Sequence, residues 1–449
     1  MLLTRHVPPA ELGIVLAAQA FTGLTLAFTE LGVPDAVVRY VGMDATPDAA
    51  PKRTVYTAVR VVVAATLLAA VIIVVGLWTW FGRGMTADAL WTTTILTLAL
   101  PLLAAGNVFG AAYRGVNRLG TKLFMIDVAR PGVVAIALVL SPLVLTGRAP
   151  YVAGLYAAGA LVTLAGVWAL FERSRRWTRD GGTAASDLLR FGVPIAGAAV
   201  IAGPLVLSVL PLMLTSWTGP AAVAMFAIAL SLQAIVYLPI AVFEQAAVPT
   251  WARMTAHAST RDLSDSYAQF SNICFAGAAS LGLLMIANDT TILVLLFGPA
   301  YGAASWALRC AVLATMFGAF TGPNEAMLRA FGLTRAIFIA RLAAAAVGVA
   351  SGLVLIPGYG LTGAAIAFAG VSVTINAAYG VTLYATKHVH PFTRRHVTTT
   401  VMSLGGILIA TLAPADYSRA AWFAVHIIAV LVVATNVDIR QAARNMVTS

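Results

Sequence analysis

The segment YTAVRVVVAATLLAAVIIVVGLWTWF, residues 56–81, decides the fold class of this chain. It contains one charged residue, Arg60, close to its start. A helix rises about 1.5 Å per residue, so a run of about 20 apolar residues crosses about 30 Å of hydrocarbon. The segment therefore predicts a transmembrane helix.

Comparable apolar runs recur along the whole chain. Of its 449 residues, 60% are hydrophobic and 10% are charged, whereas soluble domains carry about 25% charged residues. This composition excludes a soluble protein, and the recurrence of the runs excludes a signal peptide followed by a globular domain. The formal charge of +11 does not indicate a nucleic-acid partner, because the basic residues lie in short connections between the runs.

The predicted fold is an all-α, polytopic membrane protein. Proline, glycine and charged clusters divide the sequence into about thirteen predicted spans. These are residues 11–33, 56–81, 88–113, 123–146, 151–171, 190–215, 220–245, 267–297, 305–331, 336–356, 361–385, 397–413 and 420–437.

The connections between these spans differ strongly in positive charge. Alternate connections collect almost all of the Lys and Arg residues, and the opposite side has only Arg5, Arg83, Arg148 and Arg419. Because cytoplasmic loops keep an excess of positive charge, we expect the carboxy terminus to lie in the cytoplasm. The same rule places residue 1 outside, which suggests that the chain starts near the end of a helix that is mostly absent.

A basic connection with Gly181 and Gly182 separates two halves of the chain. The stretch at 112–124 resembles the one at 327–338, and Asn107 and Asn324 lie in the helices before them. Such weak, ordered similarity favours two parallel repeats of the kind found in transporters. We therefore expect an amino-terminal lobe over residues 1–180, a carboxy-terminal lobe over 181–390, and two further helices over 391–449.

Four motifs carry a resemblance to a known family. They are LLTRHVPPAELGIVLAAQAFTGLTLAFTELGVPDAVVRY at 2–40, DLLRFGVPI at 187–195, VLLFGPAYGAA at 294–304 and LIPGYGLTGAAIAF at 355–368. With them the chain resembles polysaccharide flippases, the exporters of O-antigen and oligosaccharide-lipids in the superfamily that includes multidrug antiporters. The resemblance implies twelve or fourteen helices, and LLTRHVPPAELG at 2–13 resembles the end of the family's first helix and the loop after it.

A lipid-linked saccharide carries a phosphate, so its transport calls for fixed positive charge in a polar cavity. Arginine suits this role because its guanidinium stays charged and binds phosphate oxygens in pairs. Arg130, Arg309 and Arg341 lie within predicted spans, and Arg39 and Arg60 flank the first cytoplasmic connection. For these five candidates the alternatives are pairing with an acid, as Asp127 allows for Arg130, extension to the membrane interface, or ordinary cytoplasmic charge.

Coupling to an ion calls for a carboxylate inside the membrane. Asp127, Glu244 and Glu325 are the candidates, with Glu30 near a helix end as a weaker one. Glu325 follows Pro323, which frees a backbone carbonyl that is able to line a cavity. The alternative for Glu325 is a role in helix packing.

Other polar side chains point to no cofactor and no metal. Amides such as Asn107, Asn324, Asn376, Gln19 and Gln233 bind sugar hydroxyls or, more often, join helices. His388 and His390 would not face one site on a helix, and Cys274 and Cys310 lie in apolar runs. There is also no P-loop, nucleophile elbow or dinucleotide fingerprint, so we expect a transporter without cofactors rather than an enzyme.

The leading hypothesis is a flippase of the cell membrane that moves a polyprenyl- or dolichyl-phosphate-linked saccharide outward by alternating access. Its partners would be the lipid-linked saccharide, membrane lipid, and glycosyltransferases or a polymerase of the same pathway, with no nucleic acid. The alternatives are an ion-coupled multidrug antiporter, which should have an acidic cavity, a membrane-embedded glycosyltransferase, which needs a larger outside loop, and a noncatalytic scaffold in polysaccharide assembly.

Overall fold

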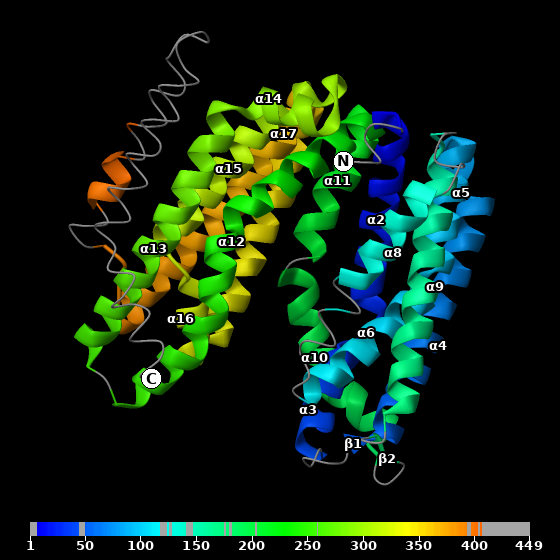
Figure 1. The fold of residues 1–449 in the computed structure, drawn as a ribbon, viewed down its shortest axis with the longest axis horizontal. Coiled ribbons are helices and arrows are strands. Elements are labelled where there is room, and N and C mark those ends of the chain that lie inside the picture. The colour runs from blue at the N-terminus through cyan, green and yellow to red at the C-terminus, as the bar shows by residue number, and fades with distance from the viewer. Residues whose placement is uncertain are drawn as a thin grey trace. The chain divides into compact units, whose positions relative to one another are not determined.

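The described part of the chain is helical apart from two strands of two residues each (Figure 1). A computed structural model describes residues 7–44, 50–116, 124, 128–140, 147–174, 177–178, 182–202, 204–257, 259–392, 397–402 and 405. Its contacts divide the chain into two compact units, residues 1–224 and 225–449. The predicted all-α class is confirmed.

The first unit contains the elements up to α11. They are α2 (Pro9–Thr29), α3 (Val33–Asp44), β1 (Ala50–Pro51), α4 (Lys52–Thr79), η1 (Phe81–Gly84), α5 (Ala87–Leu98), α6 (Leu100–Gly115), α8 (Arg130–Leu140), α9 (Ala149–Arg173), β2 (Trp177–Thr178), α10 (Ala185–Ala202) and α11 (Pro204–Thr218). Small side chains of α3, α4 and α6 lie in its core, as with Ala36, Ala58 and Ala104. Such side chains let helix backbones approach closely.

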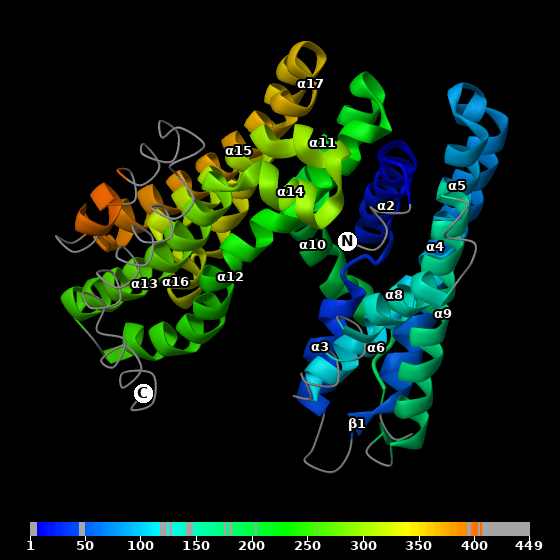
Figure 2. The same ribbon diagram turned by 45° about the horizontal axis from the view of Figure 1, so that its top comes forward.

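The second unit is built from longer helices. They are α12 (Pro220–His257), whose first residues belong to the first unit, α13 (Thr260–Ala287), α14 (Asp289–Phe297), η4 (Pro299–Ala304), α15 (Ser305–Thr321), α16 (Asn324–Ala330) and α17 (Thr334–Lys387). α15 packs against α13 and α17, and α16 packs against α17, which the turned view shows (Figure 2). A core around Trp251, Tyr267, Met327 and Tyr379 joins α12, α13, α16 and α17.

Eight helices among the described residues are long and apolar enough to cross a membrane. One of them, α17, has 54 residues, which at about 1.5 Å each is far longer than one crossing of about 30 Å. Gly360, with φ 52°, breaks α17 three residues after Pro357, between the predicted spans 336–356 and 361–385. The last two predicted spans fall almost entirely outside the described residues, so the count of thirteen stays a prediction.

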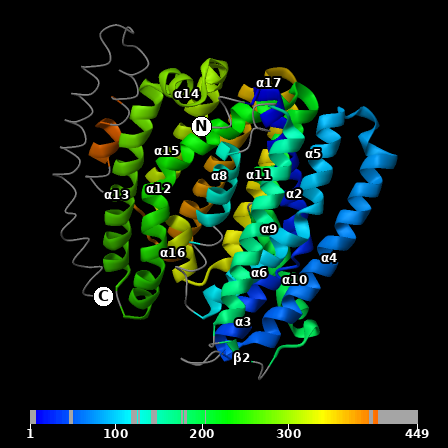
Figure 3. The same ribbon diagram turned by 45° about the vertical axis from the view of Figure 1, so that its right-hand side comes forward.

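The predicted lobe boundary differs from the boundary between the compact units. The sequence predicts that the first lobe ends at residue 180, whereas the contacts of α10 and α11 group them with the helices before them. α11 packs on α2, and α10 packs on α3 and α2, as the third view shows (Figure 3). The assignment of these two helices to a lobe stays a prediction, as does the third segment, 391–449.

The start of the connection between the two halves packs within the first unit. β1 and β2 pair in parallel, with Ala50 opposite Trp177 and Pro51 opposite Thr178. The buried Trp177 ring lies 4.5 Å from that of Phe171, and Lys52 forms an ion pair with Glu172 at 2.5 Å. The start of the predicted linker is therefore part of the packed structure.

A second break separates α15 from α16 at Gly322 and Pro323. Gly322 has φ +80°, and a Cβ there would lie 1.8 Å from Oγ of Ser271. Tyr267 donates a hydrogen bond of 2.6 Å to the backbone oxygen of Thr321, just before the break. Both residues are buried, so this bond satisfies a carbonyl that would otherwise be left without a partner away from the surface. The close approach of α13 therefore requires a glycine at position 322.

Gly322→Ala should lower the stability of the second unit. The left-handed backbone costs about 1–3 kcal/mol for a residue with a side chain, and the contact with Ser271 adds to it. The measurement is thermal unfolding of the detergent-purified chain. Gly332→Ala is the matched control, because Gly332 has φ +71° but open space around its Cβ position. Equal losses for both variants would contradict the role given to Ser271.

Candidate functional site

The most concentrated group of charged side chains among the described residues surrounds Glu325 in the second unit. Nη2 of Arg341 lies 2.7 Å from both carboxylate oxygens of Glu325. Arg329, one helical turn after Glu325, donates to the same carboxylate. The Glu325 side chain is 15% exposed, whereas those of Arg341 and Arg329 are 23% and 55% exposed. One mostly buried carboxylate thus holds two arginines.

Tyr379 ties this group to α17. Its hydroxyl accepts a hydrogen bond of 3.0 Å from Nε of Arg341 and donates one of 3.2 Å to Glu325. Three groups on α16 and α17 therefore form a closed ring of hydrogen bonds. We refer to Glu325, Arg329, Arg341 and Tyr379 as the Glu325 cluster.

Glu244 on α12 lies within electrostatic range of Glu325, Arg329 and Arg341. Its carboxylate accepts a hydrogen bond of 2.8 Å from the Tyr237 hydroxyl, two helical turns earlier. Within the described part of the chain, no basic side chain forms an ion pair with it. Among the carboxylates of this region, Glu244 is thus the one whose hydrogen-bond partner is uncharged.

An amide group lies beside the break at Gly322. Nδ2 of Asn324 is 3.0 Å from Oγ1 of Thr321 and 3.3 Å from Oδ1 of Asn376, while Nδ2 of Asn376 donates to the Ser372 backbone at 2.8 Å. Gln233 likewise donates to Thr315 at 2.5 Å. The bonds of Asn324 and Gln233 join helices, as expected for the more frequent role of such amides, whereas the bond from Asn376 to Ser372 lies within α17.

The predicted arginines fall into two groups. Arg309 is paired with the buried Asp289 and lies over the ring of Trp306, and Arg341 is paired with Glu325. Arg39 and Arg60 are exposed on α3 and α4 and form no ion pair with any described residue. The guanidinium of Arg39 lies 4.3 Å from the ring centre of Phe191, a stacking that leaves its nitrogen atoms open.

Several predicted residues lie elsewhere or outside the described part. Asp127 and the side chain of Arg130 are outside it, so their pairing stays a prediction. Glu30, at the end of α2, accepts a hydrogen bond of 2.7 Å from Asn107 in the first unit. Arg39 lies on helix α3 rather than in an irregular connection. The described residues contain no cluster of metal-ligating side chains.

Arg329, Tyr379 and Asp289 are not among the site residues predicted from the sequence. The spacing of four between Glu325 and Arg329 is that of an ion pair on one helix face, so that pair is accessible from the sequence. The contact of Tyr379 with Glu325 joins positions 54 residues apart, and no local pattern reveals it.

The sequence profile of a family described as polysaccharide biosynthesis protein matches residues 1–255, more than half of the chain. The chain belongs to this family. No curated protein sequence gives a significant match. Membership confirms the family resemblance, and the matched range contains the first two of the four motifs, at 2–40 and 187–195.

Solved structures similar to this polysaccharide biosynthesis protein are membrane transporters. An inward-facing multidrug-resistance MATE transporter of the MOP superfamily matches with a TM-score of 0.61 and 14% identity, over 92% of this chain and 94% of that one. The lipid II flippase MurJ, in an inward closed conformation, matches with a TM-score of 0.60 and 13% identity, over 95% of this chain and 96% of that one. A crystal structure of a MATE point mutant matches with a TM-score of 0.56 and 15% identity, over 86% of this chain and 90% of that one. At these identities the likeness establishes the fold, and the chain is a multi-pass membrane protein.

The Glu325 cluster should contribute measurably to stability. Glu325→Gln removes a charged partner from two arginines, and hydrogen bonds to charged groups contribute about 1.5–3 kcal/mol each. The free energy of unfolding of the purified chain should fall by about 2–3 kcal/mol. Combining Glu325→Gln with Arg341→Gln should cost less than the sum of the two changes.

Asp88→Asn is the matched control for this loss. Asp88 forms an ion pair with Arg148 at 2.8 Å, but that arginine is 58% exposed, and surface pairs contribute about 0–1 kcal/mol. Additive losses for Glu325→Gln and Arg341→Gln would show that the two side chains do not act together.

Proposed function

We propose that this chain is a flippase of the cell membrane, moving a saccharide linked to a polyprenyl or dolichyl phosphate from the cytoplasmic to the outer face. In this proposal the carboxy terminus lies in the cytoplasm, and glycosyltransferases or a polymerase of the same pathway supply and consume the substrate. Family membership and the shared transporter fold support transport. The substrate class rests on the positive charge of the described residues.

The observation that carries the proposal is the pairing of Arg341 with Glu325. An arginine that binds two carboxylate oxygens through one nitrogen is able to bind two phosphate oxygens in the same place. The 23% exposure of Arg341 leaves it within reach of a ligand. We therefore propose that the Glu325 carboxylate occupies the position in which the substrate phosphate binds. During transport the phosphate replaces this carboxylate as the partner of Arg341.

The exposed arginines of the first unit fit an earlier contact with the same phosphate. Arg39 and Arg60 form no ion pair with a described acid, so a phosphate binds them without breaking an existing pair. Arg309 differs, because its partner Asp289 is only 4% exposed. We propose Arg39 and Arg60 for first contact, Arg341 for exchange, and Arg130 and Arg309 as further candidates on the path. Two lobes that open alternately to the two sides would carry the phosphate between them.

The second candidate function is an ion-coupled multidrug antiporter. One observation favours it, namely the carboxylate of Glu244, whose hydrogen-bond partner Tyr237 is neutral. A carboxylate of this kind binds a proton, a metal cation or an organic cation. The same group serves ion coupling in a flippase, with Asp127 and Glu325 as the other proposed coupling residues.

Translocation of a fluorescent polyprenyl-phosphate saccharide in proteoliposomes tests the proposal. The native chain should flip it, and Arg341→Ala and Arg39→Ala should lower the rate severalfold because each removes a phosphate contact. Arg261→Ala is the control, since Arg261 is exposed in the first turn of α13 and is not a proposed contact. If the chain exports a cationic dye but does not flip the saccharide, the antiporter is favoured. If it shows neither activity, the scaffold is favoured.

Ion coupling should depend on Glu244 more than on Glu325. Glu244→Gln should remove most of the increase in flipping rate that an imposed proton or sodium gradient produces, because the amide neither protonates nor binds a cation strongly. The measurement is the rate with and without each gradient. Glu325→Gln is the comparison, since Glu325 is already neutralised by two arginines. An unchanged gradient response in Glu244→Gln would contradict this assignment.

A further inference from the structure

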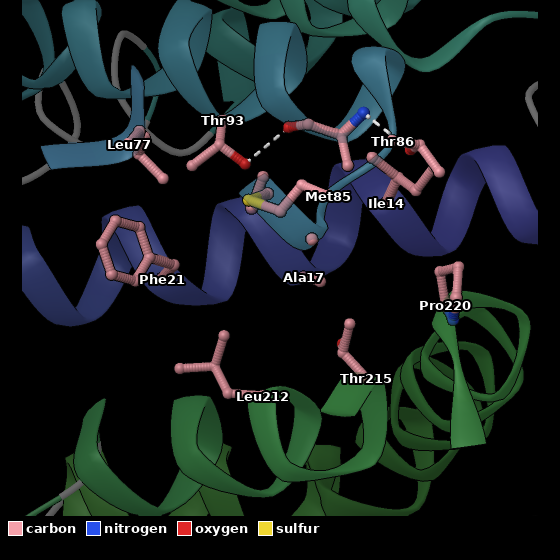
Figure 4. A pocket seen from close by; sticks show the side chains of 13 residues that line it. Ile14, Ala17, Phe21, Leu77, Met85, Thr86, Thr93, Leu212, Thr215 and Pro220 are labelled. Atoms are coloured by element: carbon pink, nitrogen blue, oxygen red, sulfur yellow. Dashed lines mark hydrogen bonds between the residues drawn. The ribbon is translucent and has the colours of Figure 1, made fainter. Parts of the chain in front are cut away.

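The first unit contains an apolar cavity of about 410 Å³ that none of the candidate residues above lines. It is bounded by α2, the end of α4, the turn after η1, the start of α5, and α11 (Figure 4). Ile14, Phe21, Leu77, Met85 and Leu212 supply its larger side chains. Its volume falls within the range of about 300–1,000 Å³ usual for sites that bind small molecules.

The polar atoms around the cavity are already bonded within their own helices. The hydroxyls of Thr93 and Thr215 donate to Ala89 and Pro211 at 2.8 and 2.9 Å. The Thr86 hydroxyl accepts a bond from the Ala89 nitrogen at the start of α5 (Figure 4). The cavity thus offers methyl and methylene groups, and a hydrocarbon chain fits this surface better than a sugar or a nucleotide.

Aromatic side chains place one end of the cavity at the surface of the membrane. Trp80 and Phe81 are 78% and 76% exposed beside η1, and Trp78 and Trp91 are about half exposed nearby. Exposed aromatic rings gather at the level of the lipid headgroups. From Met85, close to this level, the cavity follows α2 from Ile14 to Phe21, a distance of about 10 Å at about 1.5 Å per residue.

A cation lies where this end of the cavity meets the aromatic residues. Arg83 in η1 is one residue before the lining residue Gly84, is exposed, and forms no ion pair with any described residue. Asp88, close to it in sequence, is already paired with Arg148. A ligand with a hydrocarbon chain in the cavity would therefore bring a headgroup phosphate to a guanidinium that no described acid neutralises.

We propose that this cavity binds the isoprenoid chain of the carrier lipid, with its phosphate at Arg83. The inference rests on the proposed function, since a lipid-linked saccharide supplies such a chain. A cavity of about 410 Å³ and about 10 Å length is wider than one straight acyl chain, and a methyl-branched chain fills it more completely. The site would hold the isoprenoid chain close to one surface of the membrane while the glycan lies on that side.

Photo-crosslinking of the full chain in lipid nanodiscs tests this site. The probe is a polyprenyl phosphate with a diazirine in its chain, and crosslinked peptides are identified by mass spectrometry. Crosslinks should fall on the peptides of α2 and α11, and unlabelled polyprenyl phosphate should compete severalfold better than phosphatidylglycerol. Crosslinks confined to other helices, or equal competition by phosphatidylglycerol, would overturn the proposal.

Three variants, each compared with a control variant, identify the residues. Ala17→Trp places an indole in the cavity and should lower the crosslink yield severalfold, and Ala17→Leu should lower it less with a smaller risk to folding. Ala20→Trp is the control on the same helix, because Ala20 does not line the cavity. Arg83→Gln should weaken binding of polyprenyl phosphate but not of the uncharged polyprenol, and Arg261→Gln should change neither. Equal yields for Ala17→Trp and Ala20→Trp would overturn the site.

Flipping measured on the same preparations separates this proposal from the proposed function. Flipping without labelling of α2 and α11 would refute the cavity site and leave the flippase standing. Labelling without flipping of any saccharide would refute the flippase and retain a binding site for the isoprenoid lipid.

Discussion

The structure depends on one constraint, the high cost of leaving a backbone polar group unbonded in hydrocarbon. Regular helices meet it along most of the chain, and the places where helices break need another solution. At Gly322 the solution is the Tyr267 hydroxyl, which binds the free carbonyl of Thr321. At the end of α2, Leu31 and Gly32 have positive φ values and Glu30 binds Asn107 from α6. In both units a polar group lies beside a break.

This coincidence explains how the charge of Glu325 is tolerated inside the protein. Glu325 follows the break at Gly322 by three residues, and its two arginines come from α16 and α17. A charge within an unbroken apolar helix has to find a partner across a packed interface, whereas a break brings several donors to one place. A site for an anionic ligand needs such donors. The break at Gly322 therefore lies close to the Glu325 cluster, in which donors from two helices meet one carboxylate.

The pairing of the arginines changes how the candidates are understood. From the sequence, the three arginines within predicted spans are stronger candidates than Arg39 and Arg60, which flank the first cytoplasmic connection. Asp289 and Glu325 neutralise Arg309 and Arg341, whereas Arg39 and Arg60 have no such partner among the described residues. An arginine with an acid partner binds an anionic ligand only by exchange, whereas an exposed arginine without such a partner binds it directly. In the proposed function the two groups serve different steps of transport.

The sequence by itself determined the all-α membrane fold, the family and the approximate position of most described helices, because apolar runs, prolines and glycines act locally. It also contained the pair Glu325 and Arg329, which are one helical turn apart. The tertiary structure alone decided that α10 and α11 pack on α2 and α3, that Tyr379 and Arg341 meet Glu325, and that a cavity opens between α2, α5 and α11. These features join residues far apart in the chain, and their distances depend on how helices pack rather than on any local pattern.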